Sequence, residues 1–158
     1  MPKSRKEHWA TVKRVFRYLR GTTDHAICYQ GRAGPNIVLD VHGFVDADWA
    51  GDLDQRRSRS GYVFSLFGGA ISWMGKKQAV VALSTIEVEY MAGTHASKEV
   101  VWLQRLCSEL GFKQQAVRID CDSQSAIFLA KNPAYHSRMK HIGVQKYIHI
   151  QGEMMYRV

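Results

Sequence analysis

Three carboxylates stand where predicted strands end and a predicted helix begins. Asp46 lies near the end of a predicted strand over residues 41–49. Glu89 lies in the first turns of a long predicted helix, and Asp122 follows a predicted strand over residues 116–121. If the two strands are neighbours and the helix packs across them, the three acids converge and repel one another unless a cation joins them. Taken separately, each acid is better explained as a surface charge or a helix cap.

The chemistry that such a cluster supports follows from its ligand atoms. Carboxylate oxygens are hard ligands, which favour Mg²⁺ or Mn²⁺. Two such ions about 4 Å apart activate a water molecule and stabilise the leaving oxygen in phosphodiester cleavage. The acids therefore indicate a metal-dependent phosphodiester chemistry, provided that the fold brings them together.

Hydrophobic spacing and turn residues predict the elements that would position these acids. Ser84 with Glu87 three residues on has the spacing of a capping box, which marks the start of the long helix. The expected order is an amphipathic basic helix at 6–20, a hairpin of strands at 26–30 and 37–39, a strand at 41–49, a hairpin of strands at 61–67 and 70–74 turning at Gly68-Gly69, one helix or two from 84 to 111, a strand at 116–121, a helix at 123–131 and a helical tail from 135. This order predicts an α/β fold with a sheet of mixed direction.

Composition limits the class of protein. The chain has 158 residues, enough for one domain with its own core, and its 46% of hydrophobic residues excludes a disordered or collagen-like chain. No run of 18 apolar residues and no apolar signal-peptide core occurs, so we expect no membrane partner. The cysteines, Cys28, Cys107 and Cys121, show no C-x-x-C spacing, which favours a reducing compartment over a disulfide framework or a zinc knuckle.

Basic residues are concentrated in a few segments. The formal net charge is +8, and seven basic side chains lie within residues 1–20. Further clusters occur at Arg56 to Arg59, at Lys76 and Lys77, and at Arg138 and Lys140. Such a distribution suits a polyanion such as nucleic acid, the plain alternative being a solvated basic face.

Several sequence blocks, in a fixed order, carry a family resemblance. They are VDADWAGDLDQRRSRSGYVFSLFGGAISWMGKKQAVVALSTIEVEYMAG from Val45 to Gly93, then EVVWLQRLCSELG, IDCDSQSAIFLAKNP and YHSRMKHI. Together they resemble the ribonuclease H domain of copia-type retrotransposon polyproteins. The preceding HWATVKRVFRYLRGT resembles the segment that joins the reverse transcriptase to that domain. The resemblance implies a ribonuclease H-like mixed β-sheet flanked by helices, with a connecting segment over residues 1–40 and a C-terminally truncated domain over residues 41–158.

The same resemblance implies roles for individual residues. Asp46, Glu89 and Asp122 match the family's catalytic and metal-binding acids, which implies Mg²⁺ or Mn²⁺ as cofactor and an RNA/DNA hybrid as partner. Gly143 stands where the family has a further metal-binding aspartate. Two-metal cleavage is therefore expected to be weakened or lost, and an active ribonuclease H-type endonuclease is left open. Asp48 and Asp120 are the candidate substitutes, although a residue two positions away lies about 6 to 7 Å along a strand. The expected location is the cytoplasm or the nucleus.

A second hypothesis belongs to another functional class. The tetrapeptide Arg17-Tyr18-Leu19-Arg20 fits the RxLR pattern of oomycete effectors. In that alternative the chain is a secreted, non-catalytic virulence protein that binds a host plant protein in the nucleus or cytoplasm and suppresses defence or cell death. The pattern is short and lies inside the predicted basic helix, and no acidic EER-like motif follows it.

Aromatic and histidine side chains have a structural explanation beside a functional one. Trp49, Trp73 and Trp102 are expected in the core rather than as stacking platforms for bases. His136 and His141 are placed to contact phosphate or to move a proton, but are as readily surface residues.

Overall fold

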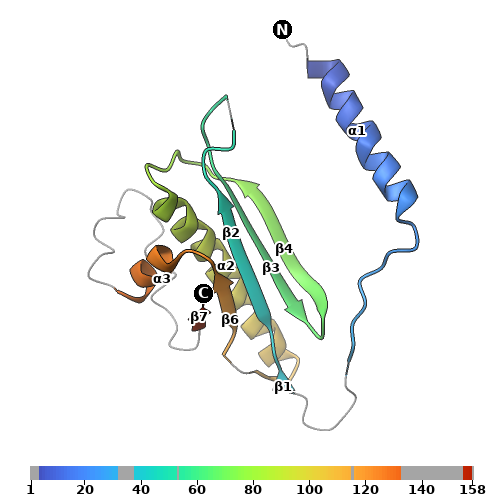
Figure 1. Cartoon of the computed structure of the whole chain (residues 1–158). Coiled ribbons are helices and arrows are strands. Elements are labelled where there is room, and N and C mark those ends of the chain that lie inside the picture. Colours follow the sequence, from blue (N-terminus) through green and yellow to red (C-terminus); the bar gives the residue numbers. More distant parts are fainter. Residues whose placement is uncertain (1–3, 32–37, 53, 115, 133–154, 158) are drawn as a thin grey trace.

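A five-stranded sheet with one long helix packed across it organises the chain (Figure 1). The computed structural model describes residues 4–31, 38–52, 54–114, 116–132 and 155–157. The elements are α1 (Ser4–Gly21), β1 (Val38–Leu39), β2 (His42–Asp48), β3 (Arg59–Leu66), β4 (Gly69–Lys77), α2 (Thr85–Glu109), β5 (Lys113–Gln114), β6 (Arg118–Cys121), α3 (Gln124–Lys131) and β7 (Met155–Arg157).

The sheet has mixed direction, as the sequence predicts. Its strand order is β4-β3-β2-β6-β7. The three strands from β2 to β4 form an antiparallel meander, whereas β6 pairs parallel with β2 and β7 pairs parallel with β6. A parallel pair needs a crossover connection, and α2 lies within it. This is the ribonuclease H-like α/β architecture with its N-terminal helix.

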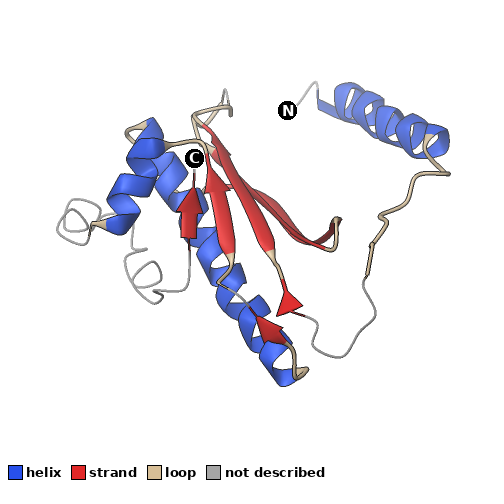
Figure 2. Ribbon diagram, turned by 60° about the horizontal axis from the view of Figure 1, so that its bottom comes forward, coloured by secondary structure: helices blue, strands red, loops and turns tan. Residues whose placement is uncertain are grey.

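The main core lies between the sheet and α2, which Figure 2 shows running along one face of the strands. Side chains alternate along each strand, so Val45 of β2 is buried while Phe44 and Asp46 on either side of it are exposed. Fully buried Phe64 of β3 and Val100 of α2 belong to the same cluster. A second, smaller cluster joins the start of α2 to α3.

The start of α2 follows the capping-box prediction. The Ser84 hydroxyl accepts a hydrogen bond from the Glu87 backbone N–H at 3.3 Å. The Glu87 carboxylate accepts in return from the backbone N–H of Leu83 at 2.7 Å, one residue earlier than in the usual motif. From there α2 is one continuous helix to Glu109 rather than two, and the hydroxyls of Thr94 and Ser97 donate to the carbonyls of Tyr90 and Gly93 in the preceding turn.

The β3–β4 hairpin is present, but its turn begins one residue earlier than predicted. Leu66 pairs with Gly69, so the two loop residues are Phe67 and Gly68 rather than Gly68 and Gly69. Both have positive φ, at 53° and 81°, as tight hairpin turns require. Glycine adopts this conformation freely, whereas Phe67 does so at a steric cost.

The hairpin predicted for residues 26–30 and 37–39 is wrong. Residues 26–30 form no strand, and β1 pairs in parallel with β5 instead. The segment after α1 attaches to the β3–β4 turn, because Gln30 donates its backbone N–H to Phe67 at 2.9 Å and the Tyr29 hydroxyl donates to the Ala70 carbonyl at 2.7 Å. Hydrogen bonds to a distant turn thus replace the expected local pairing.

Predictions for the C-terminal part are only partly covered. Most of the helical tail expected from residue 135, together with His136, His141 and Gly143, lies outside the described residues. Its last described part, Met155–Arg157, is strand β7 and not helix. The helical prediction is therefore wrong for these three residues, which pair with β6.

The three tryptophans named above are not core residues. Trp49 is 51% exposed, Trp73 66% and Trp102 54%. Trp73 pairs with Val63 on β3, and the neighbouring position, Phe64, faces α2. Alternation therefore turns Trp73 to the sheet face opposite α2.

Helix α1 has the predicted amphipathic pattern, and Figure 1 shows it set apart from the sheet. Its apolar stripe is exposed rather than packed and consists of Trp9, Val12, Val15, Phe16 and Leu19. Within the part of the chain that the structure describes, no helix combines the length and the apolar character needed to cross a membrane.

Gly43 offers a direct test of the packing under the sheet. A Cβ added at this position would collide with Cε1 of the Phe64 ring, and this ring is fully buried and must shift to make room. We expect Gly43→Ala to lower the free energy of unfolding by about 1–3 kcal/mol, the usual cost of overpacking a core. Urea unfolding measures the change. Gly75→Ala on β4, where a Cβ meets nothing within 4 Å, is the control and should differ little from wild type.

Candidate metal centre

Two of the predicted acids reach the same end of the sheet because their strands are parallel neighbours. The β2–β6 ladder pairs His42 with Arg118 and ends at Val45 opposite Cys121. Asp46 and Asp122 each follow directly on that last pair. The carboxyl ends of adjacent parallel strands are a common place for ligand sites.

Helix α2 supplies the third acid. Glu89 lies in its second turn, and α2 packs on the face of the sheet that carries Val45 and Cys121. One carboxylate oxygen of Glu89, one of Asp122 and the Sγ of Cys121 all lie within 4.8 Å of one another. Asp122 is exposed, Glu89 is half-buried and Cys121 is buried.

The electrostatics of Glu89 show how crowded this end of the sheet is. Burial, and after it the negative charges of Asp122 and Asp46, together raise the pKa of Glu89 from 4.5 to about 7, against a hydrogen bond from the Ala47 backbone that lowers it. Its Oε2 is buried and has no hydrogen-bond partner among the described residues. A carboxyl group in this position is charged at neutral pH only at a cost, which a nearby cation removes.

The same charges act on Cys121. Burial raises the pKa of its thiol, and a hydrogen bond from the Ser123 backbone lowers it. The carboxylates of Glu89, Asp122 and Asp46 raise this pKa further. Asp46 therefore lies within electrostatic reach of both Glu89 and Cys121. Its Oδ1 accepts a hydrogen bond of 2.8 Å from the Ala47 backbone N–H.

The structure thus brings Glu89 and Asp122 together and places Asp46 beside them. Cys121 is the member that sequence reasoning missed. Its signal was its position immediately before Asp122 at the end of a buried strand, but a cysteine there is equally typical of a core residue.

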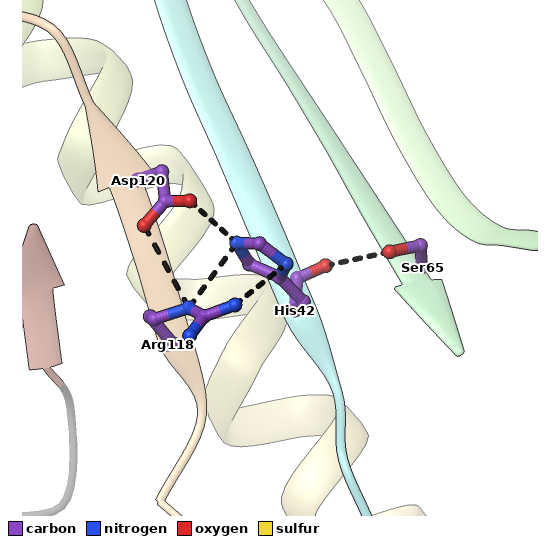
Figure 3. A network of polar contacts seen from close by, with 4 residues as sticks. All are labelled: His42, Ser65, Arg118 and Asp120. Carbon is purple, nitrogen blue, oxygen red and sulfur yellow. Dashed lines mark hydrogen bonds and ion pairs between the residues drawn. The ribbon is translucent and has the colours of Figure 1, made fainter. Parts of the chain in front are cut away.

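Asp120 does not belong to the cluster of Glu89, Cys121 and Asp122. Figure 3 shows it in a separate network, where its Oδ2 lies 2.6 Å from Nε2 of His42 and its Oδ1 3.8 Å from Nε of Arg118. The guanidinium Nη2 of Arg118 lies 3.1 Å from Nδ1 of His42. The Ser65 hydroxyl donates a hydrogen bond to the His42 carbonyl. This candidate substitute for a missing metal ligand therefore has other partners.

Basic side chains lie near the acidic cluster. Arg59 pairs in register with Asp48 on β2 and with Lys77 on β4, so these cations share the end of the sheet that carries Asp46. Arg59 and Lys76 are exposed. Burial lowers the pKa of His95 on α2, and the charges of Lys98 and Lys76 lower it further, so Lys76 of β4 lies within electrostatic reach of α2.

The fold and the carboxylate cluster define a ribonuclease H-like α/β protein. Comparison with known proteins confirms the retroelement resemblance: the chain is related to a segment of copia-type, retrovirus-related Pol polyproteins. It is 52% identical over 140 residues to the polyprotein from transposon TNT 1-94 of Nicotiana tabacum, covering 89% of this chain and 10% of that protein. It is 42% identical over 139 residues to that from transposon RE2 of Arabidopsis thaliana, covering 87% and 9%.

A relative of another kind is also similar. Secreted RxLR effector protein 161 of Plasmopara viticola is 51% identical over 96 residues, which cover 61% of this chain and 65% of that protein. No family model matches the chain. The chain spans about a tenth of the length of the two polyproteins.

Proposed function

We propose that this chain is a ribonuclease H-type domain that binds RNA/DNA hybrids and holds Mg²⁺ or Mn²⁺ at Asp46, Glu89 and Asp122. The observation that carries the proposal is the meeting of Glu89 from α2 with Asp122 at the end of β6, where the pKa of Glu89 is raised to about 7. In the proposed organisation residues 1–40 are the connecting segment and residues 41–158 the domain.

The proposed reaction is hydrolysis of a phosphodiester bond in the RNA strand. A bound divalent ion supplies Lewis-acid stabilisation of the attacking and leaving oxygens. Asp46 and Asp122 supply exposed carboxylates to hold it, and Glu89 approaches from the helix side. The half-buried position of Glu89 fixes its carboxylate better than a surface side chain would be fixed, which favours a defined ligand geometry.

The basic side chains support a polyanionic substrate. Arg59, Lys76 and Lys77 border the acidic end of the sheet, and Lys77 is itself held by Asp52 and Gln55. Phosphates bound by such cations would lie beside the carboxylates. Gly143, in the place of an expected acid, supports weakened rather than full cleavage, because one ligand for the second ion is absent.

Hybrid binding and cleavage test the proposal together. With an RNA/DNA hybrid carrying labelled RNA, we expect slow RNA cleavage that needs Mg²⁺ or Mn²⁺ and stops with EDTA, and no cleavage of duplex DNA. Affinity for the hybrid should fall steeply between about 50 and 200 mM salt, because phosphate contacts release counterions. Affinity that is unchanged over this range, or absent for hybrids, contradicts the proposal.

The effector relative favours a second candidate function. In it, the chain acts without catalysis inside host plant cells, where it binds a host protein and suppresses defence or cell death. Arg17, Tyr18, Leu19 and Arg20 are all exposed on α1 and are therefore accessible to a partner. Expressed in plant cells, wild type and Glu89→Gln should then suppress elicited cell death equally. Suppression by wild type alone would contradict a non-catalytic role.

A further inference from the structure

The thiol in the carboxylate cluster changes which metals the site can bind. Mg²⁺ takes oxygen ligands and gains little from sulfur, whereas Zn²⁺ and Cd²⁺ bind thiolates well. We propose that Glu89, Cys121 and Asp122 form a thiophilic metal site that overlaps the proposed Mg²⁺ site and takes Zn²⁺, with Cd²⁺ as its spectroscopic analogue. Among the described residues no other group of three His, Cys, Asp or Glu side chains brings its ligand atoms as close.

The backbone explains how two consecutive residues serve one ion. Within a strand, Cys121 and Asp122 would point to opposite faces. The β2–β6 ladder ends at Cys121, and Asp122 lies beyond it in a bend before α3. The change of direction lets the Cys121 Sγ and an Asp122 carboxylate oxygen share one 4.8 Å cluster with Glu89.

The distances suit a small tetrahedral ion after a modest contraction. Around Zn²⁺, with bonds of about 2.0–2.3 Å, neighbouring ligand atoms are about 3.5 Å apart. The three atoms lie within 4.8 Å of one another, so each pair needs to close by about 1.3 Å at most. A rotamer adjustment of the exposed Asp122 side chain supplies part of this movement.

Two features of the surroundings support a bound cation there. The Glu89 Oε2 is buried and finds no hydrogen-bond partner in the part of the chain that the structure describes, so an ion would satisfy this oxygen. Cys121 and Glu89 also line one small pocket with Val45, Tyr90 and Gly93, which limits water around the thiol. Asp122 and Asp46 leave the outer side of the cluster exposed, which gives the ion a path of entry.

Zinc binding would exclude the ion required for cleavage. Glu89 and Asp122 belong to both ligand sets, so the two metals compete for the same oxygens. The expected inhibition by Zn²⁺ rests on the proposed function, whereas the binding of Zn²⁺ does not.

Cadmium titration of the full chain tests the site directly. We expect one equivalent of Cd²⁺ to produce an ultraviolet thiolate-to-metal charge-transfer band in wild type. Cys121→Ser should lose the band and bind Zn²⁺ at least tenfold more weakly in calorimetry. Cys28→Ser removes an exposed thiol and is the matched control. It should keep both the charge-transfer band and the wild-type affinity for Zn²⁺. A band that persists in Cys121→Ser, or is lost in Cys28→Ser, overturns the inference.

A measurement on the wild-type chain covers the case in which Cys121→Ser does not fold. Zn²⁺ should slow alkylation of Cys121 by iodoacetamide, mapped by peptide mass, and leave alkylation of Cys28 unchanged. Equal alkylation of Cys121 with and without Zn²⁺ overturns the inference. If Zn²⁺ does not inhibit Mg²⁺-dependent cleavage, the expected competition between the two metals for Glu89 and Asp122 is overturned. Zinc binding without any cleavage leaves the site standing and removes the proposed function.

Discussion

Glu89→Gln is expected to remove hybrid cleavage and at the same time to stabilise the metal-free protein. Glutamine keeps the shape of the side chain but loses a negative charge that the site would use to hold a cation. We expect the cleavage rate to fall by about 100-fold or more, to background. At pH 8 without metal, the free energy of unfolding should rise by about 1–3 kcal/mol, because the buried charge next to Asp122 and Asp46 is gone.

The pH dependence of stability gives the sign of this effect. The pKa of Glu89 rises from 4.5 to about 7 on folding, so between these values the folded state keeps a proton that the unfolded state has lost. The contribution of Glu89 to stability is therefore fully present below about pH 4.5 and is lost as the pH rises to about 7. The Glu89→Gln protein should not show this loss of stability as the pH rises.

Urea unfolding from pH 4.5 to 8 in EDTA measures the difference between the two proteins. Glu109→Gln, at the exposed C-terminal end of the same helix, is the control and should keep the wild-type dependence. If wild type and Glu89→Gln lose stability equally over this range, Glu89 is not the group that titrates. A fully active Glu89→Gln protein would remove Glu89 from the proposed metal site.

Gly143→Asp is expected to raise the rate of hybrid cleavage at least tenfold. Gly143 lies outside the described residues, so the expectation rests on the family resemblance and on the chemistry of the cluster. A fourth carboxylate would supply a ligand for the second ion and hold both ions at a fixed separation. Single-turnover cleavage at saturating Mg²⁺ measures the rate.

The control for this variant adds the same charge elsewhere. Gly31→Asp introduces an aspartate at an exposed position where a Cβ meets nothing within 4 Å, and it should leave the rate unchanged. Vigorous Mg²⁺-dependent cleavage by the unmodified chain would mean that three carboxylates suffice. No gain from Gly143→Asp would mean that the missing acid is not what limits the rate.

Local rules account for the parts of the fold that the sequence predicts correctly. The capping box at Ser84 and Glu87, and the alternation around Val45, depend on residues a few positions apart, and both appear in the structure. The errors arise where distant groups compete. The Tyr29 hydroxyl donates to the distant Ala70 carbonyl, and the segment around Tyr29 forms no local hairpin. Trp73 is exposed because the alternation of side chains along β4 turns it to the face of the sheet opposite α2.

The candidate site shows the same division. The placement of Asp46 and Asp122 at strand ends follows from hydrophobic spacing, and their meeting required only that the strands be neighbours. The approach of Cys121 could not be predicted from spacing, because alternation puts it on the face opposite Asp122 until the strand ends. The pKa of Glu89 likewise depends on its burial in the folded chain and on the charges of Asp122 and Asp46, which are distant in sequence.

The parallel pairing of β2 with β6 also determines when the acidic end can exist during folding. The meander from β2 to β4 joins segments that are close in sequence, whereas β6 must return to β2 across the whole of α2, with His42 and Arg118 separated by 76 positions. Loop closure over such a distance is entropically costly, and contacts of this kind form late. Asp46 therefore enters structure with the meander, but it meets Asp122 only when β6 docks against β2. If the proposed metal site is correct, metal affinity would report that docking step, and a chain stalled before it would keep the meander and bind no ion.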